Sequence, residues 1–244
     1  PTEVIDLPSQ GKVYPKDSVL ADGKLELKYM TTKEEDILMS SNLIKKGVVI
    51  DKLIDSLIVT KGVNQDDLVL GDKNAILVAA RILAYGPEYT CKVSNPNNPE
   101  QQVEHTFDLS QCPFKETIDG VDYSKNSFEY TTPVGKDKLK FKILTGKDEA
   151  KIEKDIKQSS KFGYNTDITT RLRYMITEVS GDSTPEMITA YTQNMLARDS
   201  IAFRKYVADI SPDIELTQEI EIGGETVSVS IPLTVEFFWP KSIE

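Results

Sequence analysis

Two distant segments of this chain share one pattern of residues. Residues 24–38 read KLELKYMTTKEEDIL, and residues 138–152 read KLKFKILTGKDEAKI. Both segments first alternate apolar and polar side chains, which predicts a strand, and then change to the spacing of a helix. At each change a threonine stands three residues before an acid, the signature of a capping box. The pairs are Thr31 with Glu34 and Thr145 with Asp148.

The order of the neighbouring elements also repeats. Upstream, DLPSQGK at 6–12 has a fainter partner in YTTPVGK at 130–136. Downstream, helical sequence ends at Gly86-Pro87 in the first half and at Ser211-Pro212 in the second, and alternation typical of a β-hairpin follows each stop. Because several elements recur in one order, the sequence predicts an internal duplication.

We therefore expect an α+β fold of two similar helical lobes, each with a β-hairpin or small antiparallel sheet. A duplicated scaffold is compatible with any function, so this organisation says little about chemistry. The expected divisions are an extended N-terminal arm at residues 1–23, a first α+β repeat at 24–114, and a second at 115–244 that ends in a hairpin and an FFWP segment.

The composition is that of an ordinary soluble globular protein. Of the 244 residues, 39% are hydrophobic and 28% are charged, and no apolar run approaches the ~20 residues that cross a bilayer. The N-terminal residues lack the character of a secretory signal, and two cysteines, Cys91 and Cys112, suit a reducing compartment better than a disulfide framework. A formal net charge of −10 disfavours binding to nucleic acid. We expect synthesis in a cytoplasm and no membrane partner.

Helical periodicity predicts helices over residues 32–40, 49–59, 73–85, 147–160, 166–179, 184–194 and 198–209. Asp72 is expected to N-cap the third helix, and Ser183 with Glu186 forms a further capping signature. Two apolar stripes on the later helices are predicted to lie in the core. They are Ile168, Leu172, Met175, Ile176 and Val179, and Phe203, Tyr206, Val207 and Ile210.

Arg81 is an unusual residue on the third predicted helix. It lies one turn from Leu77 and Tyr85 and leans towards the apolar face. A buried guanidinium needs a carboxylate or several carbonyl groups, because an unpaired buried charge costs several kcal/mol. Asp72 is half a turn out of phase and about 13.5 Å away along the axis. We expect an acid from another element to pair with Arg81, with an external anion as the alternative.

The sequence offers little for catalysis. It contains no GxxxxGK[ST], GxGxxG or GxSxG motif. His105 is the only histidine and stands in an alternating segment, where a place on a sheet face is the ordinary explanation. Cys91, His105 and Cys112 are three widely spaced residues, whereas a closed zinc site takes four close ones. We expect no enzyme activity, no cofactor and no metal.

The two ends of the chain are the candidates for contact with other proteins. The opening segment either binds neighbours as an arm or packs against its own domain through Val4, Leu7, Val13 and Tyr14. At the other end, Phe237, Phe238 and Trp239 precede Pro240. These aromatic side chains either close the core of the second domain or anchor another subunit.

An ordered set of segments resembles one known family, the baseplate hub assembly proteins of T-even-type contractile-tailed bacteriophages. The likeness spans nearly the whole chain and depends on the order and spacing of its pieces. They are LPSQGKVYP at 7–15, TTKEEDIL at 31–38, GDKNAILVAARILAYGPEY at 71–89, FDLS at 107–110, LARDSIAFRKYVADISPDI at 196–214 and EFFWP at 236–240.

The resemblance implies a non-enzymatic protein that helps to build the central hub of the tail baseplate through protein contacts. Its partners would be other hub or spike proteins, with self-association left open, and its place the host cytoplasm during assembly and, if retained, the virion tail. A transient assembly chaperone, absent from the finished virion, is the alternative.

The resemblance also marks Asp72 and Arg81 as positions that matter for the fold or for an interface. The family that the chain resembles often has a zinc-ribbon-like CPxC in the first hairpin and, in many members, a second in the C-terminal hairpin. This chain departs from that pattern, with VSNPNNPEQQ and EIEIGGETVS at these places. We therefore expect the hairpins to be held without zinc.

Overall fold

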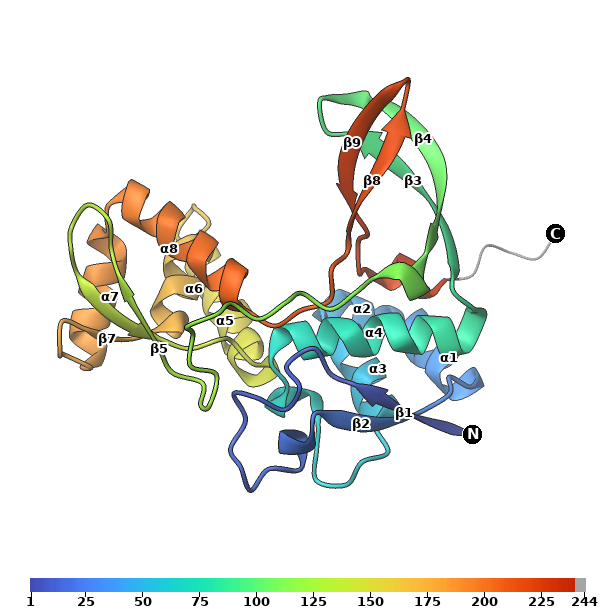
Figure 1. Cartoon of the computed structure of the whole chain (residues 1–244), viewed down its shortest axis with the longest axis horizontal. Helices are drawn as coiled ribbons and strands as arrows, with labels where there is room; N and C mark the ends of the chain where they lie inside the picture. Colours follow the sequence, from blue (N-terminus) through green and yellow to red (C-terminus); the bar gives the residue numbers. More distant parts are fainter. Residues whose placement is uncertain (240–244) are drawn as a thin grey trace.

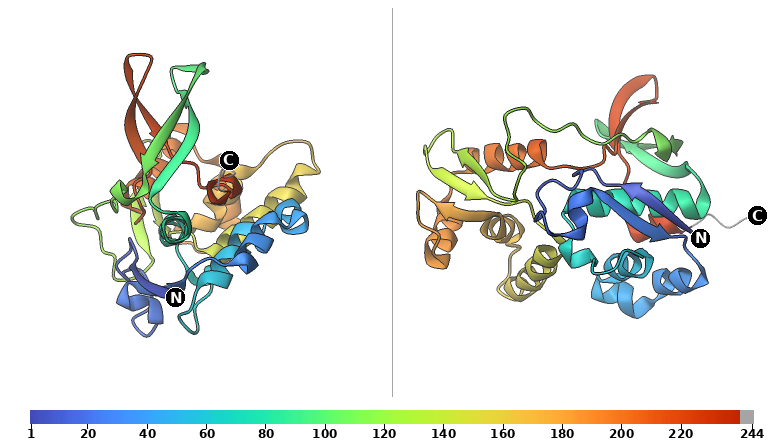
Figure 2. Two further views of the ribbon diagram at one scale, coloured as in Figure 1. Left: turned by 90° about the vertical axis from the view of Figure 1, so that its right-hand side faces the viewer. Right: turned by 60° about the horizontal axis from the view of Figure 1, so that its bottom comes forward.

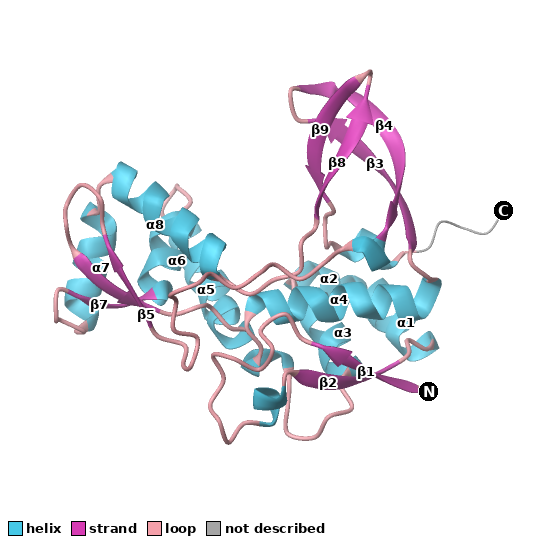
Figure 3. Ribbon diagram, in the orientation of Figure 1, coloured by secondary structure: helices cyan, strands magenta, loops and turns pink. Residues whose placement is uncertain are grey.

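The computed structural model of the chain describes residues 1–239 and mixes helices with small antiparallel sheets (Figures 1 and 3). The predicted α+β class is confirmed. In chain order the elements are β1 Thr2–Asp6, η1 Val19–Asp22, β2 Lys24–Lys28, α1 Thr32–Met39, α2 Ser41–Lys46, α3 Val49–Leu57, η2 Gln65–Asp67, α4 Leu70–Tyr85, β3 Glu88–Asn95, β4 Asn98–Asp108, η3 Leu109–Gln111, β5 Phe128–Thr131, β6 Lys138–Phe141, α5 Gly146–Ser160, α6 Asp167–Met175, β7 Ile176–Val179, α7 Pro185–Asn194, α8 Ala197–Ile210, β8 Thr217–Ile222, β9 Glu225–Ser230 and η4 Val235–Phe238.

The first lobe contains the opening segment as part of its body. β1 pairs antiparallel with β2, and Leu7, Val13 and Tyr14 are buried in the core, whereas Val4 is exposed. The segment thus packs against its own lobe, the second of the two alternatives above. Helices α1 to α3 lie beside α4, which runs through the middle of the lobe (Figure 1).

The second lobe is built from a three-stranded sheet, β5-β6-β7, with α5 to α8 around it. β7 was predicted as the end of a helix over 166–179, and this prediction is wrong. The helix stops at Met175, and residues 176–179 pair with β6. Ile176 and Val179 are buried in this strand, as they would be in a longer α6 helix. The spacing of apolar residues therefore does not distinguish the helix from the strand.

Both predicted capping boxes are present. The Thr31 amide donates to Glu34 Oε2 (2.8 Å) at the start of α1, and the Thr145 amide donates to Asp148 Oδ2 (3.0 Å) at the start of α5. Three smaller predictions are corrected. Thr184 rather than Ser183 caps α7, Ile168 is exposed, and residues 41–46 form an additional short helix.

The two β-hairpins form as predicted, but the second does not lie on its own lobe. β8-β9 packs against β3-β4, and together they project from the first lobe (Figures 1 and 2). A single two-stranded hairpin is marginally stable in water, so each needs a cover for its apolar face. The two hairpins, called the twin hairpins below, supply that cover to each other. Their buried residues include Tyr89, Val93, Phe107, Ile220, Ile222, Val227 and Val229.

Two connectors, residues 112–127 and residues 211–216, run side by side and join the lobes. The Lys115 amide donates to the Asp213 carbonyl (2.8 Å), and the Glu215 amide donates to the Pro113 carbonyl (2.7 Å). The start of α4 packs closely against the connector at residues 211–216. A Cβ on Gly71 would lie 1.7 Å from the Pro212 carbonyl oxygen, so only glycine fits there. The chain thus leaves the first lobe and re-enters it at one place.

Candidate functional site

Asp72 is buried in the first turn of α4, and it fixes the opening segment to that helix. Its carboxylate accepts from the Ser9 amide (3.0 Å), the Ser9 hydroxyl (2.6 Å) and the Tyr14 hydroxyl (2.7 Å). The Tyr14 oxygen accepts in turn from the Val69 amide (3.0 Å). The prediction that Asp72 caps α4 is wrong, since the helix begins at Leu70. The side chain holds a loop rather than its own helix end.

The electrostatics of this cluster follow from its burial. Burial raises the pKa of Asp72 above its ordinary value, against the hydrogen bonds from Ser9 and Tyr14, which lower it. Burial and the Asp72 charge raise the pKa of Tyr14, so its hydroxyl remains a donor. Leu7, two residues before Ser9, lies in the core. The structure therefore brings Tyr14 and Asp72 together, and Leu7 fixes the same opening segment in the core.

Arg81 is also buried on α4, but its partners are not the expected acid. Its Nε donates to the Phe237 carbonyl (2.9 Å), and its guanidinium carbon lies 4.9 Å from the ring centre of Tyr85 and 5.6 Å from that of Tyr89. Within residues 1–239 it forms no salt bridge with a carboxylate. The carbonyl and the negative faces of the rings offset the charge instead. Burial lowers the pKa of Arg81.

The aromatic residues near the C-terminus divide into two groups. Phe237 and Phe238 are buried and close a core, as one alternative predicted, but it is the core of the first lobe. Phe237 and Tyr89 form a T-shaped contact with ring centres 4.9 Å apart. Trp239 instead leaves 43% of its surface exposed. Arg81 thus ties this late segment to α4, with Trp239 held at the surface.

An open groove of about 400 Å³ lies where α1, the end of α4 and the end of η4 with Trp239 meet. Its residues are Glu35, Leu38, Met39, Tyr85, Phe238 and Trp239. Met39 is 69% exposed and lines the groove together with the exposed Trp239, so the two side chains form one apolar surface. Glu35 supplies charge at the edge: together with burial, it raises the pKa of Tyr85. We call this feature the acidic-rimmed groove.

The tips of the twin hairpins are joined by polar side chains. Asn95 Nδ2 donates to Glu225 Oε2 (3.1 Å), and Asn97 Nδ2 donates to Glu225 Oε1 (2.7 Å). These hydrogen bonds lower the pKa of Glu225. Asparagine and carboxylate groups here form a direct link between the tips. The two loops lie at the far end of the projection (Figure 2), and residues 96–100 and 223–226 in them are exposed.

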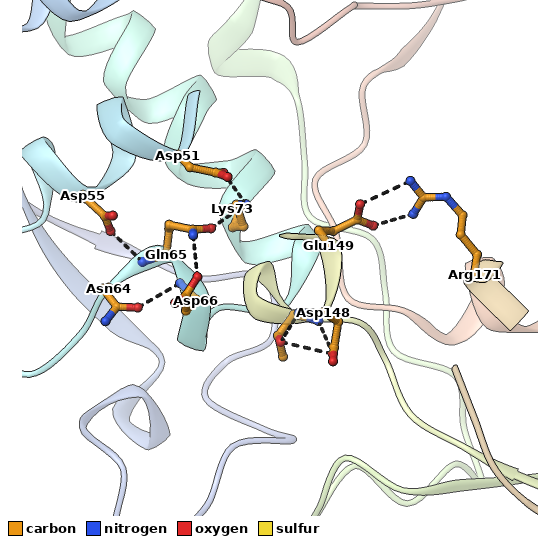
Figure 4. Close-up of polar contacts among 10 residues, drawn as sticks. Asp51, Asp55, Asn64, Gln65, Asp66, Lys73, Asp148, Glu149 and Arg171 are labelled. Carbon is orange, nitrogen blue, oxygen red and sulfur yellow. Dashed lines mark hydrogen bonds and ion pairs between the residues drawn. The ribbon is translucent and has the colours of Figure 1, made fainter. Parts of the chain in front are cut away.

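A polar cluster lies where the lobes meet (Figure 4). Lys73 Nζ on α4 donates to Asp51 Oδ1 (2.9 Å) and to Gln65 Oε1 (3.0 Å), and the backbone of Gln65 faces the start of α5. A bidentate pair between Glu149 and Arg171 fastens α5 to α6 nearby. All these groups have partners in the chain, so the cluster is a structural joint.

The described residues offer no arrangement for metal binding. Within residues 1–239, no group of three His, Cys, Asp or Glu side chains is placed to hold a metal ion. The His105 ring contacts Phe107 with centres 4.6 Å apart, as a residue on a sheet face would. None of the helices described over this range is long and apolar enough to cross a bilayer.

Sequence reasoning missed three residues that the structure makes important. Ser9 gives Asp72 two of its hydrogen bonds, Met39 lines the groove, and Glu225 joins the hairpin tips. Ser9 lies in the LPSQGKVYP segment, which was a usable signal. No sequence signal marks Met39 or Glu225, because their roles depend on contacts between distant parts of the chain.

Comparison with known proteins gives one match. Neither the curated proteins nor the solved structures contain a match to this chain. A family model described as "T4 bacteriophage base plate protein" matches residues 2–238, which is nearly the whole chain and includes both lobes and the twin hairpins. The resemblance seen in the sequence is thus confirmed as membership of a phage base plate family. The chain belongs to the T4 bacteriophage base plate protein family.

Proposed function

We propose that this protein is a non-enzymatic structural and assembly component of the base plate hub, which acts by docking other phage proteins. The observation that carries the proposal is the twin-hairpin projection in a member of a base plate family. The hydrogen bonds of Glu225 hold the two tips in one arrangement, so little order is lost when a partner binds them. The partner class is another hub or spike protein of the phage.

The test is co-expression with candidate hub proteins, followed by native mass spectrometry. Glu100 is exposed at the tip of the first hairpin, and Glu116 is exposed on a connector. We expect Glu100→Arg to reduce capture of the hub partner about tenfold through a changed charge in the contact, and Glu116→Arg to leave it unchanged. Equal capture by both variants would exclude the tips as the docking surface.

A chaperone that departs before completion would use the same surface. Mass spectrometry of purified tails separates the two roles, because a structural component remains in the particle at a fixed ratio to the hub proteins. Its absence from finished tails, with assembly still dependent on it, would replace the structural role by the chaperone role.

A further inference from the structure

The loop between α5 and α6 exposes two aromatic side chains. Phe162 is 82% exposed and Tyr164 is 71% exposed, and Gly163 between them has a positive φ of 98° that turns the chain. We call residues 161–165 the aromatic loop. Covering exposed aromatic side chains with a partner surface is favourable, and such residues are enriched at protein interfaces.

A row of lysines leads along α5 to this loop. Its members are spaced by three or four positions, which places them on one face of the helix, and all are exposed. Within residues 1–239 none of them forms a salt bridge, although the chain as a whole carries a formal net charge of −10. This lysine row therefore suits an acidic surface. It consists of Lys147, Lys151, Lys154, Lys157 and Lys161.

The acidic-rimmed groove has the complementary character. Its floor is apolar, through Leu38, Met39 and Phe238, and Glu35 lies at its edge. Asp36 and Glu236 are exposed on the elements that form it, α1 and η4. A surface that combines apolar side chains with carboxylates fits an aromatic loop flanked by lysines.

The loop and the groove belong to different lobes. α5 and α6 lie in the lobe at the left of Figure 1, whereas α1 and the end of α4 lie at the right-hand end of the molecule. We propose that the aromatic loop of one copy inserts into the acidic-rimmed groove of a second copy, with the lysine row facing Glu35, Asp36 and Glu236. Such a head-to-tail contact leaves one loop and one groove unused in a dimer, so it continues into a ring or a filament.

This inference deepens the proposed docking function by naming a second copy as one partner. Its test uses the purified full chain alone, by sedimentation velocity over a range of protein concentrations. We expect oligomers that grow with concentration and weaken as salt is raised to about 1 M, where the screening length is about 3 Å. A wild-type chain that stays monomeric at every concentration would overturn the proposal without bearing on capture of hub proteins by the hairpin tips.

Two variants make the test specific. The double change Phe162→Ser with Tyr164→Ser removes the loop contact, and Met39→Arg places a positive charge in the groove. All three side chains are exposed, so the fold is retained. We expect each variant alone to lose self-association about tenfold or more. The control is Ile201→Ser, an exposed apolar position on α8 outside both surfaces, which should associate like the wild type.

Mixing the two variants is the decisive experiment. One intact groove and one intact loop remain in the mixture, so we expect a one-to-one dimer that grows no further. If the mixture stays monomeric while the wild type associates, or if Ile201→Ser disrupts association as strongly as the other changes, the head-to-tail contact is wrong.

Discussion

Asp72 and Asp199 show how one buried carboxylate fixes a turn to the start of a helix. Asp72 accepts from the Ser9 amide at the start of α4, and Asp199 accepts from the Val134 (2.8 Å) and Gly135 (2.9 Å) amides at the start of α8. Each of these turns follows a proline. The similarity of these two contacts supports the predicted duplication, which stays a prediction.

Removal of the Asp72 carboxylate is expected to destabilise the protein strongly. Asp72→Ala would leave the Ser9 amide and the Ser9 and Tyr14 hydroxyls buried without an acceptor, at a cost of about 3 kcal/mol in the free energy of unfolding. Urea denaturation measures this loss. The exposed Asp209→Ala is the control and should change the free energy by less than about 0.5 kcal/mol. Similar values for both variants would contradict the role given to Asp72.

Glu34 predicts a pH dependence. Burial opposes its charge, but Lys28, Ser56 and Thr31 all donate to it, and the net effect lowers its pKa from 4.5 to about 2. The folded pKa is below the unfolded one. The stabilisation is therefore fully present above about pH 4.5 and is lost as the pH falls towards 2.

The matched variant is Glu34→Gln, which cannot ionise. We expect it to be less stable than the wild type by about 2 kcal/mol at neutral pH, with the difference shrinking as the pH is lowered through this window. Chemical denaturation at several pH values measures the difference. Glu153→Gln, an exposed change on α5, should show no such trend. A constant difference for Glu34→Gln would show that its charge does not contribute.

At the scale of elements, the close contact between the lobes requires a glycine at the start of α5. Gly146 begins α5, and a Cβ there would lie 2.1 Å from the Gln65 carbonyl oxygen. By helix propensity alone, Gly146→Ala would stabilise the protein by up to about 1 kcal/mol. We expect a loss of about 2 kcal/mol instead, because the lobes must move apart. The sign of the change in melting temperature decides between the two effects.

Local sequence patterns predicted most helices and strands. They failed where the same spacing of apolar residues fits either a helix or a strand. The capping boxes at Thr31 and Thr145 were predictable because their hydrogen bonds lie within a few residues of sequence. Residues 176–179 were not, since β7 buries the same apolar side chains that a longer α6 would bury. The partner strand, β6, decides the outcome, and it lies far away in the sequence.

At the scale of the whole molecule, the sequence predicted the hairpins but not their association. Each hairpin showed one apolar face, and nothing within either segment indicated what covers it. Arg81 was recognised as needing a partner, yet the partner is a backbone carbonyl of Phe237, which no residue pattern records. The groove likewise depends on α1 meeting the C-terminal segment.

The mutual cover of the hairpins leads to a prediction over long range. Ile222→Ala removes buried apolar volume from β8 and should cost about 3 kcal/mol. Hydrogen exchange measured by mass spectrometry should then become faster in β3-β4 as well as in β8-β9, while β5 to β7 keep their protection. Faster exchange confined to β8-β9 would show that the hairpins are independent.

The paired connectors have a consequence for synthesis on the ribosome. The second lobe is an insertion between the two parts of the first, so the β3-β4 hairpin is translated long before its cover. At about 5–20 residues per second, the ribosome needs roughly 5–20 s to extend the nascent chain from Asp108 to Thr217. During that interval the inner face of the hairpin is uncovered, and the first lobe completes its folding only after the second has emerged.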